Sequence, residues 1–290
     1  MPENRRVCQR NCSTGILPVG LSGILPDAKT NGTGETPIRP KGKMPVLQSL
    51  MMEVAGNLER VRSQIAEAAK KSGRPIDDIE LVAISKTHEA EKVRAAFDAG
   101  QQLFGESRVQ EARVKIPLLP SAAHWHFVGP LQRNKIRHAL PLFDLFHSVD
   151  SLELARDMNR IADEGGMRPR VLLEVNVAGE GSKIGFAPDS LRAEMEALLE
   201  LPCLTIEGLM TIPPLAPEAE ASRRYFVMLR KLRDQFAREF QIELPHLSMG
   251  MTGDFSVAIE EGATLVRVGT AIFGKRTPIR QRHALSGEGP

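Results

Sequence analysis

The regular part of the sequence begins near residue 50, where apolar residues recur at spacings of three and four. These residues are Leu50, Val54, Leu58, Val61, Ile65 and Ala68. The spacing places the apolar side chains on one face of an α-helix. We therefore expect an amphipathic helix before any strand.

Beyond this helix, short apolar runs alternate with stretches of helical periodicity, as from Leu152 to Ala162 and from Tyr225 to Phe240. Parallel strands need such crossovers, and eight βα units close most economically into a cylinder. We therefore predict an α/β fold, namely a single TIM-type (β/α)8 barrel preceded by the N-terminal helix. The strands are expected near residues 80–85, 102–105, 124–128, 145–149, 170–177, 204–210, 246–249 and 264–268.

An open doubly wound sheet is the alternative, and it would carry a Gly-x-Gly-x-x-Gly turn after its first strand. The first predicted strand ends instead in Ser85, Lys86 and Thr87. The glycines of residues 179–185 have the wrong spacing and follow the fifth strand. The barrel therefore remains the prediction.

The first 46 residues differ from the rest of the chain, because they are dense in Gly, Pro, Thr and Asn and lack a long apolar pattern. Such a segment cannot bury a core. We expect a disordered or artefactual extension over residues 1–46, the barrel over residues 47–276, and a C-terminal tail over residues 277–290. Translation can begin instead at a later methionine, namely Met44, Met51 or Met52.

Composition narrows the class of protein. The 290 residues hold 38 Lys and Arg against 36 Asp and Glu, without the excess of base that is typical of nucleic-acid binding. No apolar stretch approaches the ~18 residues that a membrane span needs. Only three cysteines occur, which predicts a reducing cytoplasmic location. We therefore expect neither nucleic acid nor a membrane as a partner.

Two histidines, His124 and His126, flank Trp125 and point to one face of the third predicted strand. Metal sites usually need at least a third protein ligand, and none is evident here. We therefore predict no metal.

Candidate chemistry in such a barrel lies where strands pass into the loops at their carboxyl ends. Lys86 follows the apolar run of residues 81–85, at the mouth of the predicted barrel. Partial desolvation there would lower the pKa of the amine and make it a nucleophile toward an aldehyde. The alternative interpretation is a solvated lysine at a strand end.

The last two predicted strands run into loops rich in Gly and hydroxyl side chains, at residues 248–254 and 267–270. Barrels frequently bind phosphate at this place, on backbone N–H groups at helix starts. A Schiff-base lysine opposite a phosphate site fits a phosphorylated aldehyde, and we predict pyridoxal 5′-phosphate (PLP) as the cofactor. Tight turns would explain the glycines alone, but not the presence of Lys86 and Arg267 on neighbouring strands.

Arg267 bears on the reaction as well as on binding. A guanidinium that faces the pyridine nitrogen would leave this nitrogen unprotonated and make the ring a poor electron sink. A racemase also needs a second acid or base opposite Lys86. The one tyrosine, Tyr225, belongs to a helical stripe that packing explains. We therefore expect a cofactor site without a catalytic partner.

Short segments spread over the chain follow one another in the order of a known family. They are residues 84–87, 104–106, 125–129, 131–135, 208–211, 247–251 and 266–274, together with Asn176 and residues 183–185. Over about residues 50–276 they closely resemble the pyridoxal phosphate homeostasis protein family. The resemblance implies a barrel like the N-terminal domain of alanine racemase, with PLP held as a Schiff base on Lys86 and no established turnover.

The resemblance also implies which side chains contact the cofactor. Arg267 would meet the pyridine nitrogen, and Thr252, Gly269 and Thr270 would hold the phosphate. Further cofactor contacts are implied for Ser107, Asn176, Met210 and Ser248.

The chain departs from the family pattern near the second strand. Ser107 stands where the family usually has Asn, and Arg108 follows where an aromatic residue is usual. These two differences leave the ring contacts at this place open. Thr252 stands where Ser is usual, which keeps the hydroxyl group.

We therefore expect a cytoplasmic PLP-binding protein that buffers or delivers the cofactor, and not a metabolic enzyme. Its partners would be PLP and the apo-forms of PLP-dependent enzymes, and it would be a monomer or a weak dimer. The alternative is a PLP-dependent amino-acid racemase. A third class, a Schiff-base aldolase, would use Lys86 directly on a sugar phosphate. A visible absorption band of the purified protein separates the first two classes from the third.

Overall fold

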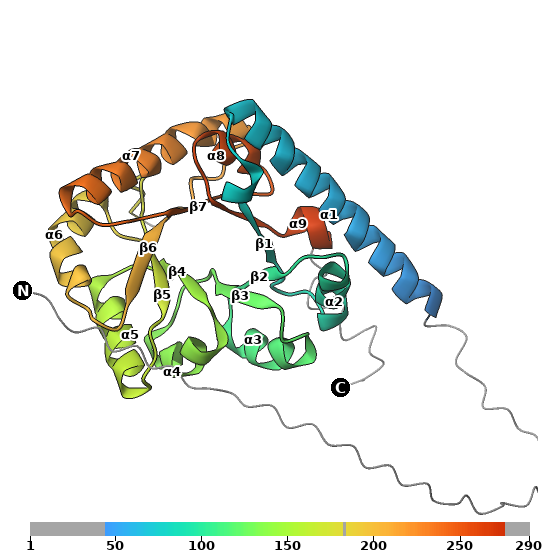
Figure 1. Cartoon of the computed structure of the whole chain (residues 1–290), viewed down its shortest axis with the longest axis horizontal. Helices are drawn as coiled ribbons and strands as arrows, with labels where there is room; N and C mark the ends of the chain where they lie inside the picture. Colours follow the sequence, from blue (N-terminus) through green and yellow to red (C-terminus); the bar gives the residue numbers. More distant parts are fainter. Residues whose placement is uncertain (1–43, 182–183, 276–290) are drawn as a thin grey trace, which may run out of the picture. The chain divides into compact units, whose positions relative to one another are not determined.

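The computed structural model describes residues 44–181 and 184–275. Eight strands form one closed parallel barrel in the order β1 to β8 (Figure 1). The predicted barrel is thus confirmed, and each strand lies where an apolar run predicted it. The strands are β1 (Glu80–Ile84), β2 (Leu103–Glu106), β3 (His124–Phe127), β4 (Leu145–Val149), β5 (Arg170–Glu174), β6 (Thr205–Met210), β7 (His246–Met251) and β8 (Leu265–Val268).

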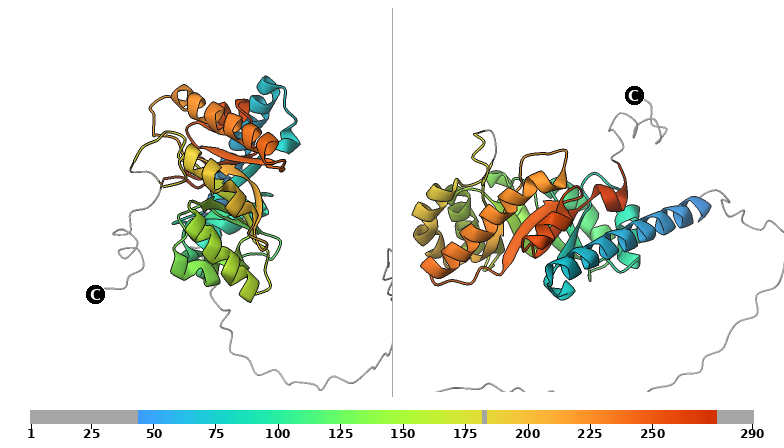
Figure 2. Two further views of the ribbon diagram at one scale, coloured as in Figure 1. Left: turned by 90° about the vertical axis from the view of Figure 1, so that its left-hand side faces the viewer. Right: turned by 90° about the horizontal axis from the view of Figure 1, so that it is seen from above.

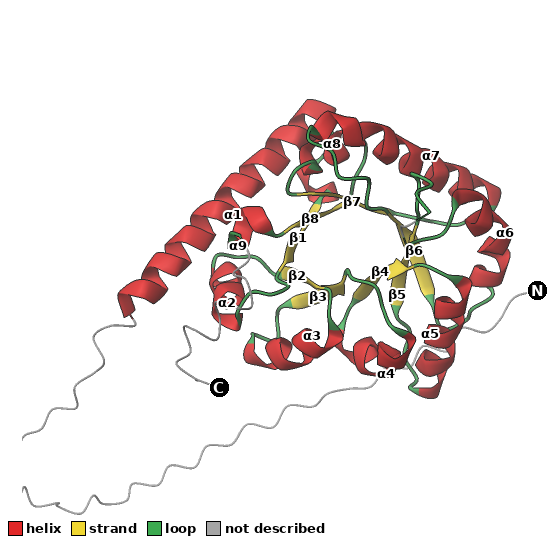
Figure 3. Ribbon diagram, turned by 180° about the vertical axis from the view of Figure 1, so that it is seen from behind, coloured by secondary structure: helices red, strands yellow, loops and turns green. Residues whose placement is uncertain are grey.

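Helices surround the ring of strands on its outer side (Figure 3). They are α1 (Met44–Ser72), α2 (Ala90–Asp98), α3 (Val109–Lys115), α4 (Ile136–Ala139), α5 (Leu152–Glu164), α6 (Pro188–Leu199), α7 (Arg223–Glu239), α8 (Phe255–Glu260) and α9 (Thr270–Phe273). Among the described residues, no helix combines the length and the apolar character that crossing a membrane requires. The predicted tails lie outside the described residues, up to residue 43 and from residue 276.

Helix α1 is the predicted N-terminal helix, and it packs along the side of the barrel against α2, α8 and α9 (Figure 2). Its apolar stripe is buried from Val54 onward. A long-range hydrogen bond joins it to the last helix, because Asn57 Nδ2 donates to the carbonyl of Ile272 at 2.9 Å. Helix α1 therefore covers the part of the barrel where β8 meets β1.

The barrel closes between β1 and β8, whose residues pair in parallel from Glu80 with Leu265 to Ala83 with Val268. This pairing sets Val82 beside Arg267. The loops that leave the two strands therefore begin next to each other. Residues that are more than 180 positions apart in the chain, such as Lys86 and Thr270, are in this way brought to the same end of the barrel.

Alternating side chains divide the core into two apolar clusters. The larger cluster lies between the strands and the helices. The smaller one fills the inside of the barrel, as the packed interiors of such barrels require. Its buried members are Val82, Ile84, Leu145, Leu172, Met210 and Leu265.

A chain that starts at Met51 is expected to keep the stability of the full chain. The truncation removes residues 1–50, of which only the end belongs to α1, and Met51 and Met52 are themselves exposed. We expect a loss of at most ~1 kcal/mol, because few apolar side chains lose burial. Thermal unfolding of both chains measures this. A drop of more than ~10 °C in Tm would show that the removed segment packs on the barrel.

Candidate functional site

The residues that were predicted to contact the cofactor all lie toward the carboxyl ends of the strands. Their strands are β1, β2, β5, β6, β7 and β8, so they border one mouth of the barrel. The structure brings some of them into direct contact and leaves others apart around the rim. The predicted residues are Lys86, Ser107, Asn176, Met210, Ser248, Thr252, Arg267, Gly269 and Thr270.

Arg267 lies inside the barrel mouth, where it is 5% exposed. Its guanidinium donates hydrogen bonds to Ser248 Oγ and, at 2.9 Å, to the carbonyl oxygen of Thr211. Burial lowers the pKa of Arg267 to about 10, so the group is still cationic at neutral pH. The site therefore contains one fixed positive charge whose remaining N–H groups can meet a ligand.

The hydrogen bonds of Arg267 continue into the barrel through two histidines. Ser248 Oγ lies 2.8 Å from His147 Nδ1, and His147 Nε2 lies 2.9 Å from His126 Nδ1. Arg267 can only donate, so Ser248 Oγ accepts from it. The tautomer of His147 sets which atoms donate in the two histidine bonds. We call Arg267, Ser248, His147 and His126 the polar column.

Both histidines of the polar column are neutral at pH 7. Burial lowers the pKa of His126 to about 3 and that of His147 well below its ordinary value. His124, the other histidine of β3, faces Asp144 instead, with Nδ1 and Oδ2 3.3 Å apart. His147 was missed. Its position could have revealed it, because it follows Leu145 by two residues in a predicted strand and so points to the same, inward face.

Glu174 is a second residue that the sequence analysis missed. It ends β5 with an inward side chain, is 8% exposed, and lies close enough to Arg267 to interact with its charge. Burial raises its pKa to about 7, and the attraction of Arg267 opposes this only in part. The mouth therefore holds a carboxyl group that changes its charge near neutral pH.

Lys86 lies in the turn after β1 and is half-buried. It lines a cavity of about 630 Å³ that opens over the ends of β2 and β3. Ser107, Arg108 and Lys135 also line this cavity, and none of its lining residues carries a carboxylate. The charged side chains that line this cavity are therefore all basic.

Ser107 is placed against the start of the next loop by a close backbone contact. A Cβ added at Gly129 would lie 2.5 Å from the carbonyl oxygen of Ser107, closer than real Cβ atoms approach. Only glycine at position 129 lets the two loops lie so near each other. Ser148 Oγ also donates to the carbonyl of Gly129, which secures this arrangement.

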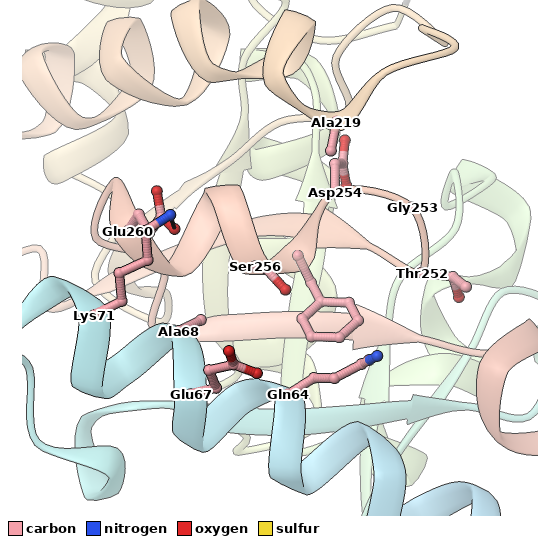
Figure 4. A pocket seen from close by; sticks show the side chains of 11 residues that line it. Gln64, Glu67, Ala68, Lys71, Ala219, Thr252, Gly253, Asp254, Ser256 and Glu260 are labelled. Carbon is pink, nitrogen blue, oxygen red and sulfur yellow. Dashed lines mark hydrogen bonds and ion pairs between the residues drawn. The ribbon is translucent and has the colours of Figure 1, made fainter.

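The loop after β7 carries Thr252 and Gly253, and it borders a separate pocket of about 400 Å³ between α1 and α8 (Figure 4). Asp254 Oδ1 accepts a hydrogen bond from the backbone N–H of Met251 at 2.7 Å, which holds the loop in shape. Glu67, Asp254 and Glu260 line this pocket together with Lys71, so the lining carries a net negative charge. The pocket is therefore unfavourable for an anion such as phosphate.

Gly269 and Thr270 form the start of α9, directly after β8. A Cβ at Gly269 would lie 3.1 Å from the carbonyl oxygen of Ile84, so a larger residue there presses on β1. The glycine thus serves barrel closure as well as any approach of a ligand. The first N–H groups of α9 have no acceptor within the helix and point to its N-terminal side.

Asn176 lies in the loop after β5. Its Nδ2 donates to the carbonyl of Glu180 at 2.8 Å, and its backbone N–H donates to the carbonyl of Phe186 at 2.9 Å. These bonds shape the loop after β5. Lys183, which the resemblance included in the same segment, lies outside the described residues.

Comparison with known proteins defines the class of this barrel. Residues 56–277 match the family model of the alanine racemase N-terminal domain. A pyridoxal phosphate homeostasis protein of Aquifex aeolicus (strain VF5) is 43% identical over 226 residues, which cover 78% of this chain and 99% of that protein. The chain therefore belongs to the pyridoxal phosphate homeostasis protein family.

Solved structures agree with this assignment. PipY of Synechococcus elongatus PCC7942, solved with PLP bound, matches with a TM-score of 0.68 and 40% identity over 76% of this chain and 100% of that chain. An alanine racemase of Clostridium difficile 630 shares the fold at 18% identity, with a TM-score of 0.60. That match covers 57% of the racemase chain.

Replacing His147 with Gln is expected to make the free energy of unfolding depend less steeply on pH in the acid range. Unfolded histidine binds a proton below its ordinary pKa of about 6.5, whereas buried His147 does not, so stability is present above this pH and lost below it. One such group contributes a slope of about 1.4 kcal/mol per pH unit. Urea unfolding between about pH 6.5 and 4.5 should give a slope smaller by about this amount in the variant.

The matched control is His138→Gln, because His138 is exposed on α4. It is expected to leave the slope as in the unchanged chain. Equal slopes for the His147 variant and the unchanged chain would show that His147 takes up its proton in the folded protein.

Proposed function

We propose that this chain binds PLP at the barrel mouth, covalently through Lys86, and serves intracellular PLP homeostasis by buffering or delivering the cofactor. The name of the Aquifex relative and the PLP bound to PipY support this proposal, since both proteins align with the whole barrel. The observation that carries it here is that Lys86 follows β1 at the mouth while the buried Arg267 stands on β8, the strand that pairs with β1 where the barrel closes.

PLP supplies an aldehyde carbon that a lysine amine can attack, a pyridine ring and a phosphate. Lys86 would provide this amine from a half-buried turn beside a cavity of about 630 Å³, which has room for such a molecule. Of the residues proposed to contact PLP, Lys86 and Ser107 line this cavity, so the phosphate would extend beyond it toward Thr252 and Thr270. The fit supports Lys86 as the attachment residue.

Arg267 would face the pyridine nitrogen. Its bonds to Ser248 and Thr211 hold the guanidinium in place, and further N–H groups of the fork can donate to the ring. A guanidinium still protonated at pH 7 donates a hydrogen bond and does not give up its proton. Arg267 would therefore orient the ring without making it a strong electron sink.

The phosphate would lie on the hydroxyl groups of Thr252 and Thr270 and the backbone N–H groups near Gly269. Two of these residues begin α9, whose N-terminal N–H groups suit an anion. Ser107 and Asn176 would approach the cofactor from the loops after β2 and β5. Met210, buried in the inner apolar cluster, would form part of the floor.

Ser248 has a different proposed role from the other predicted contacts. Its hydroxyl already accepts from Arg267 and bonds His147, so it would act on PLP through Arg267. Ser248 is also completely buried, and two of the three hydrogen bonds that a hydroxyl group can make are already used within the protein.

We further propose that the protein works in the cytoplasm, as a monomer or weak dimer, and passes PLP to apo-forms of PLP-dependent enzymes. A homeostatic role agrees with the name of the Aquifex relative, and the absence of turnover is part of our proposal. Tyr225 does not supply a second catalytic group, because it lies on outer helix α7 and accepts a hydrogen bond from Arg224 at 2.6 Å.

An amino-acid racemase is the second candidate function, and Glu174 is the observation in its favour. The carboxyl group lies at the mouth, and its pKa of about 7 suits proton transfer near neutral pH. A racemase would need both this group and the Lys86 amine, one for each face of the substrate carbon. The two candidate functions therefore differ in the effect of Glu174→Gln, which would abolish turnover only in a racemase.

Lys86→Ala is expected to remove the visible absorption band of lysine-bound PLP and to leave the fold intact, because a half-buried side chain at the mouth adds little to the core. Borohydride reduction and peptide mapping of the unchanged chain should place the pyridoxyl group on Lys86. The control is Lys71→Ala, an exposed lysine on α1, which should keep the band. Pyridoxyl found mainly on another lysine would contradict the assignment.

Purified protein is expected to transfer PLP to an apo-enzyme and to show no steady racemisation of alanine, serine or other common amino acids. A positioned acid or base contributes about 10²–10⁴-fold to a rate, and Arg267 limits the ring as an electron sink. Chiral chromatography measures racemisation. Turnover at about 1–10³ per second, lost in both Lys86→Ala and Glu174→Gln, would establish the racemase instead.

A further inference from the structure

A cluster of three charged side chains, two of them buried and one partly exposed, lies against the turn that carries Lys86. Lys115, at the end of α3, is 5% exposed, and Glu106, at the end of β2, is completely buried. The Lys115 ammonium donates to Glu106 Oε1 at 2.5 Å and to Glu111 Oε1 at 2.8 Å. Its third bond goes to the backbone carbonyl of Ser85 at 2.9 Å, so all three of its donors are used.

The two carboxylates of this cluster both accept hydrogen bonds from residues of the turn that carries Lys86. Glu106 Oε1 accepts a hydrogen bond from Ser85 Oγ at 2.6 Å. Glu111 Oε1 accepts one from the backbone N–H of Thr87, also at 2.6 Å. The residues directly before and after Lys86 are thus both held by the cluster. We call Glu106, Glu111 and Lys115 the clamp.

The conformation of the turn needs such support. Thr87 has a φ of 68°, in the left-handed region, which a β-branched residue rarely adopts. Strained backbone of this kind persists only where surrounding interactions determine it, and it gathers at functional sites. The hydrogen bond from the Thr87 backbone N–H to Glu111 acts directly on this left-handed residue.

Stability alone does not explain the clamp. Glu106 Oε2 is buried and has no hydrogen-bond partner among the residues that the structure describes, and burial raises the pKa of this carboxyl group. Apolar residues of similar volume often stabilise a core better than a buried ion pair with an unpaired oxygen. The clamp and the strained Thr87 both act on one turn, and that turn contains Lys86.

We propose that Lys115 and Glu111 are positioning residues for Lys86, which act with Glu106 by fixing the turn of residues 85–87. The clamp holds Thr87 in its left-handed conformation, and this conformation directs the Lys86 amine into the mouth. The part of the proposal that concerns PLP rests on the proposed function. The effect on the turn itself does not, because it is present without any ligand.

The test compares Glu111→Ala with Glu111→Gln in the full chain. Glutamine keeps an oxygen that can accept from Thr87, whereas alanine does not. Without PLP, the NOE between the amide and Hα protons of Thr87, strong at a left-handed φ, should weaken in the alanine variant and remain in the glutamine variant. With PLP, the alanine variant should raise Kd about tenfold or more, and the glutamine variant should stay within about threefold.

Lys115→Met removes the centre of the clamp. Lys71→Met is its control, because Lys71, near the end of α1, is exposed and pairs with Glu260 of α8 and not with a residue of the clamp. We expect the first variant to weaken PLP binding at least as much as Glu111→Ala, and the control to have no effect. If Lys115→Met does not fold, the two Glu111 variants decide the question. They are the safer pair, because Glu111 is partly exposed.

An unchanged Thr87 NOE in Glu111→Ala, or PLP binding within twofold of the unchanged chain, would overturn the proposal. Equal losses in the alanine and glutamine variants would also overturn it, since the hydrogen bond to Thr87 would then not be the cause. If the unchanged chain binds no PLP, the proposed function fails, and the NOE comparison still decides whether the clamp sets the turn.

Discussion

Closure of the sheet between β1 and β8 is the constraint on which the rest of the structure depends. It pairs Val82 with Arg267, and so sets the loop that carries Lys86 next to the loop that starts α9. No local pattern in the sequence can bring these segments together, because almost the whole barrel lies between them. Helix α1 packs over this side of the barrel and bonds α9 through Asn57, so the long helix before the first strand supports the closure.

The polar column supports Arg267 and the clamp supports Lys86, the two basic residues that closure of the barrel brings to the same mouth. Under Arg267, the polar column runs into a barrel interior that is otherwise apolar, and it ends on a neutral histidine. Under Lys86, the clamp holds a strained turn from both of its ends. Buried polar groups are costly unless their hydrogen bonds are satisfied, so both systems restrict these residues to one arrangement. The proposed role, holding PLP without turnover, would need this rigidity more than it needs a second catalytic group.

The sequence predicted the barrel and the strand ends because hydrophobic periodicity reports directly on strands and helices. Lys86 and Arg267 could be found because each stands at a predicted strand end. His147 and Glu174 were missed, although both lie on the inward face of their strands, since an isolated polar residue in a strand does not reveal its partner. The clamp could not be predicted from the sequence, because the contact of Lys115 with Ser85 depends on how α3 packs against the strands. Identity with curated relatives and with PipY then assigns the family, which the geometry alone does not.

The central claim is that one PLP molecule joins Lys86 to the loops after β7 and β8. A crystal structure of the protein crystallised with PLP tests it most directly. We predict electron density continuous with Lys86 Nζ, a pyridine nitrogen within hydrogen-bond distance of the Arg267 guanidinium, and the phosphate at Thr252, Gly269 and Thr270. PLP attached to another lysine, or a phosphate in the acidic pocket between α1 and α8, would contradict the account.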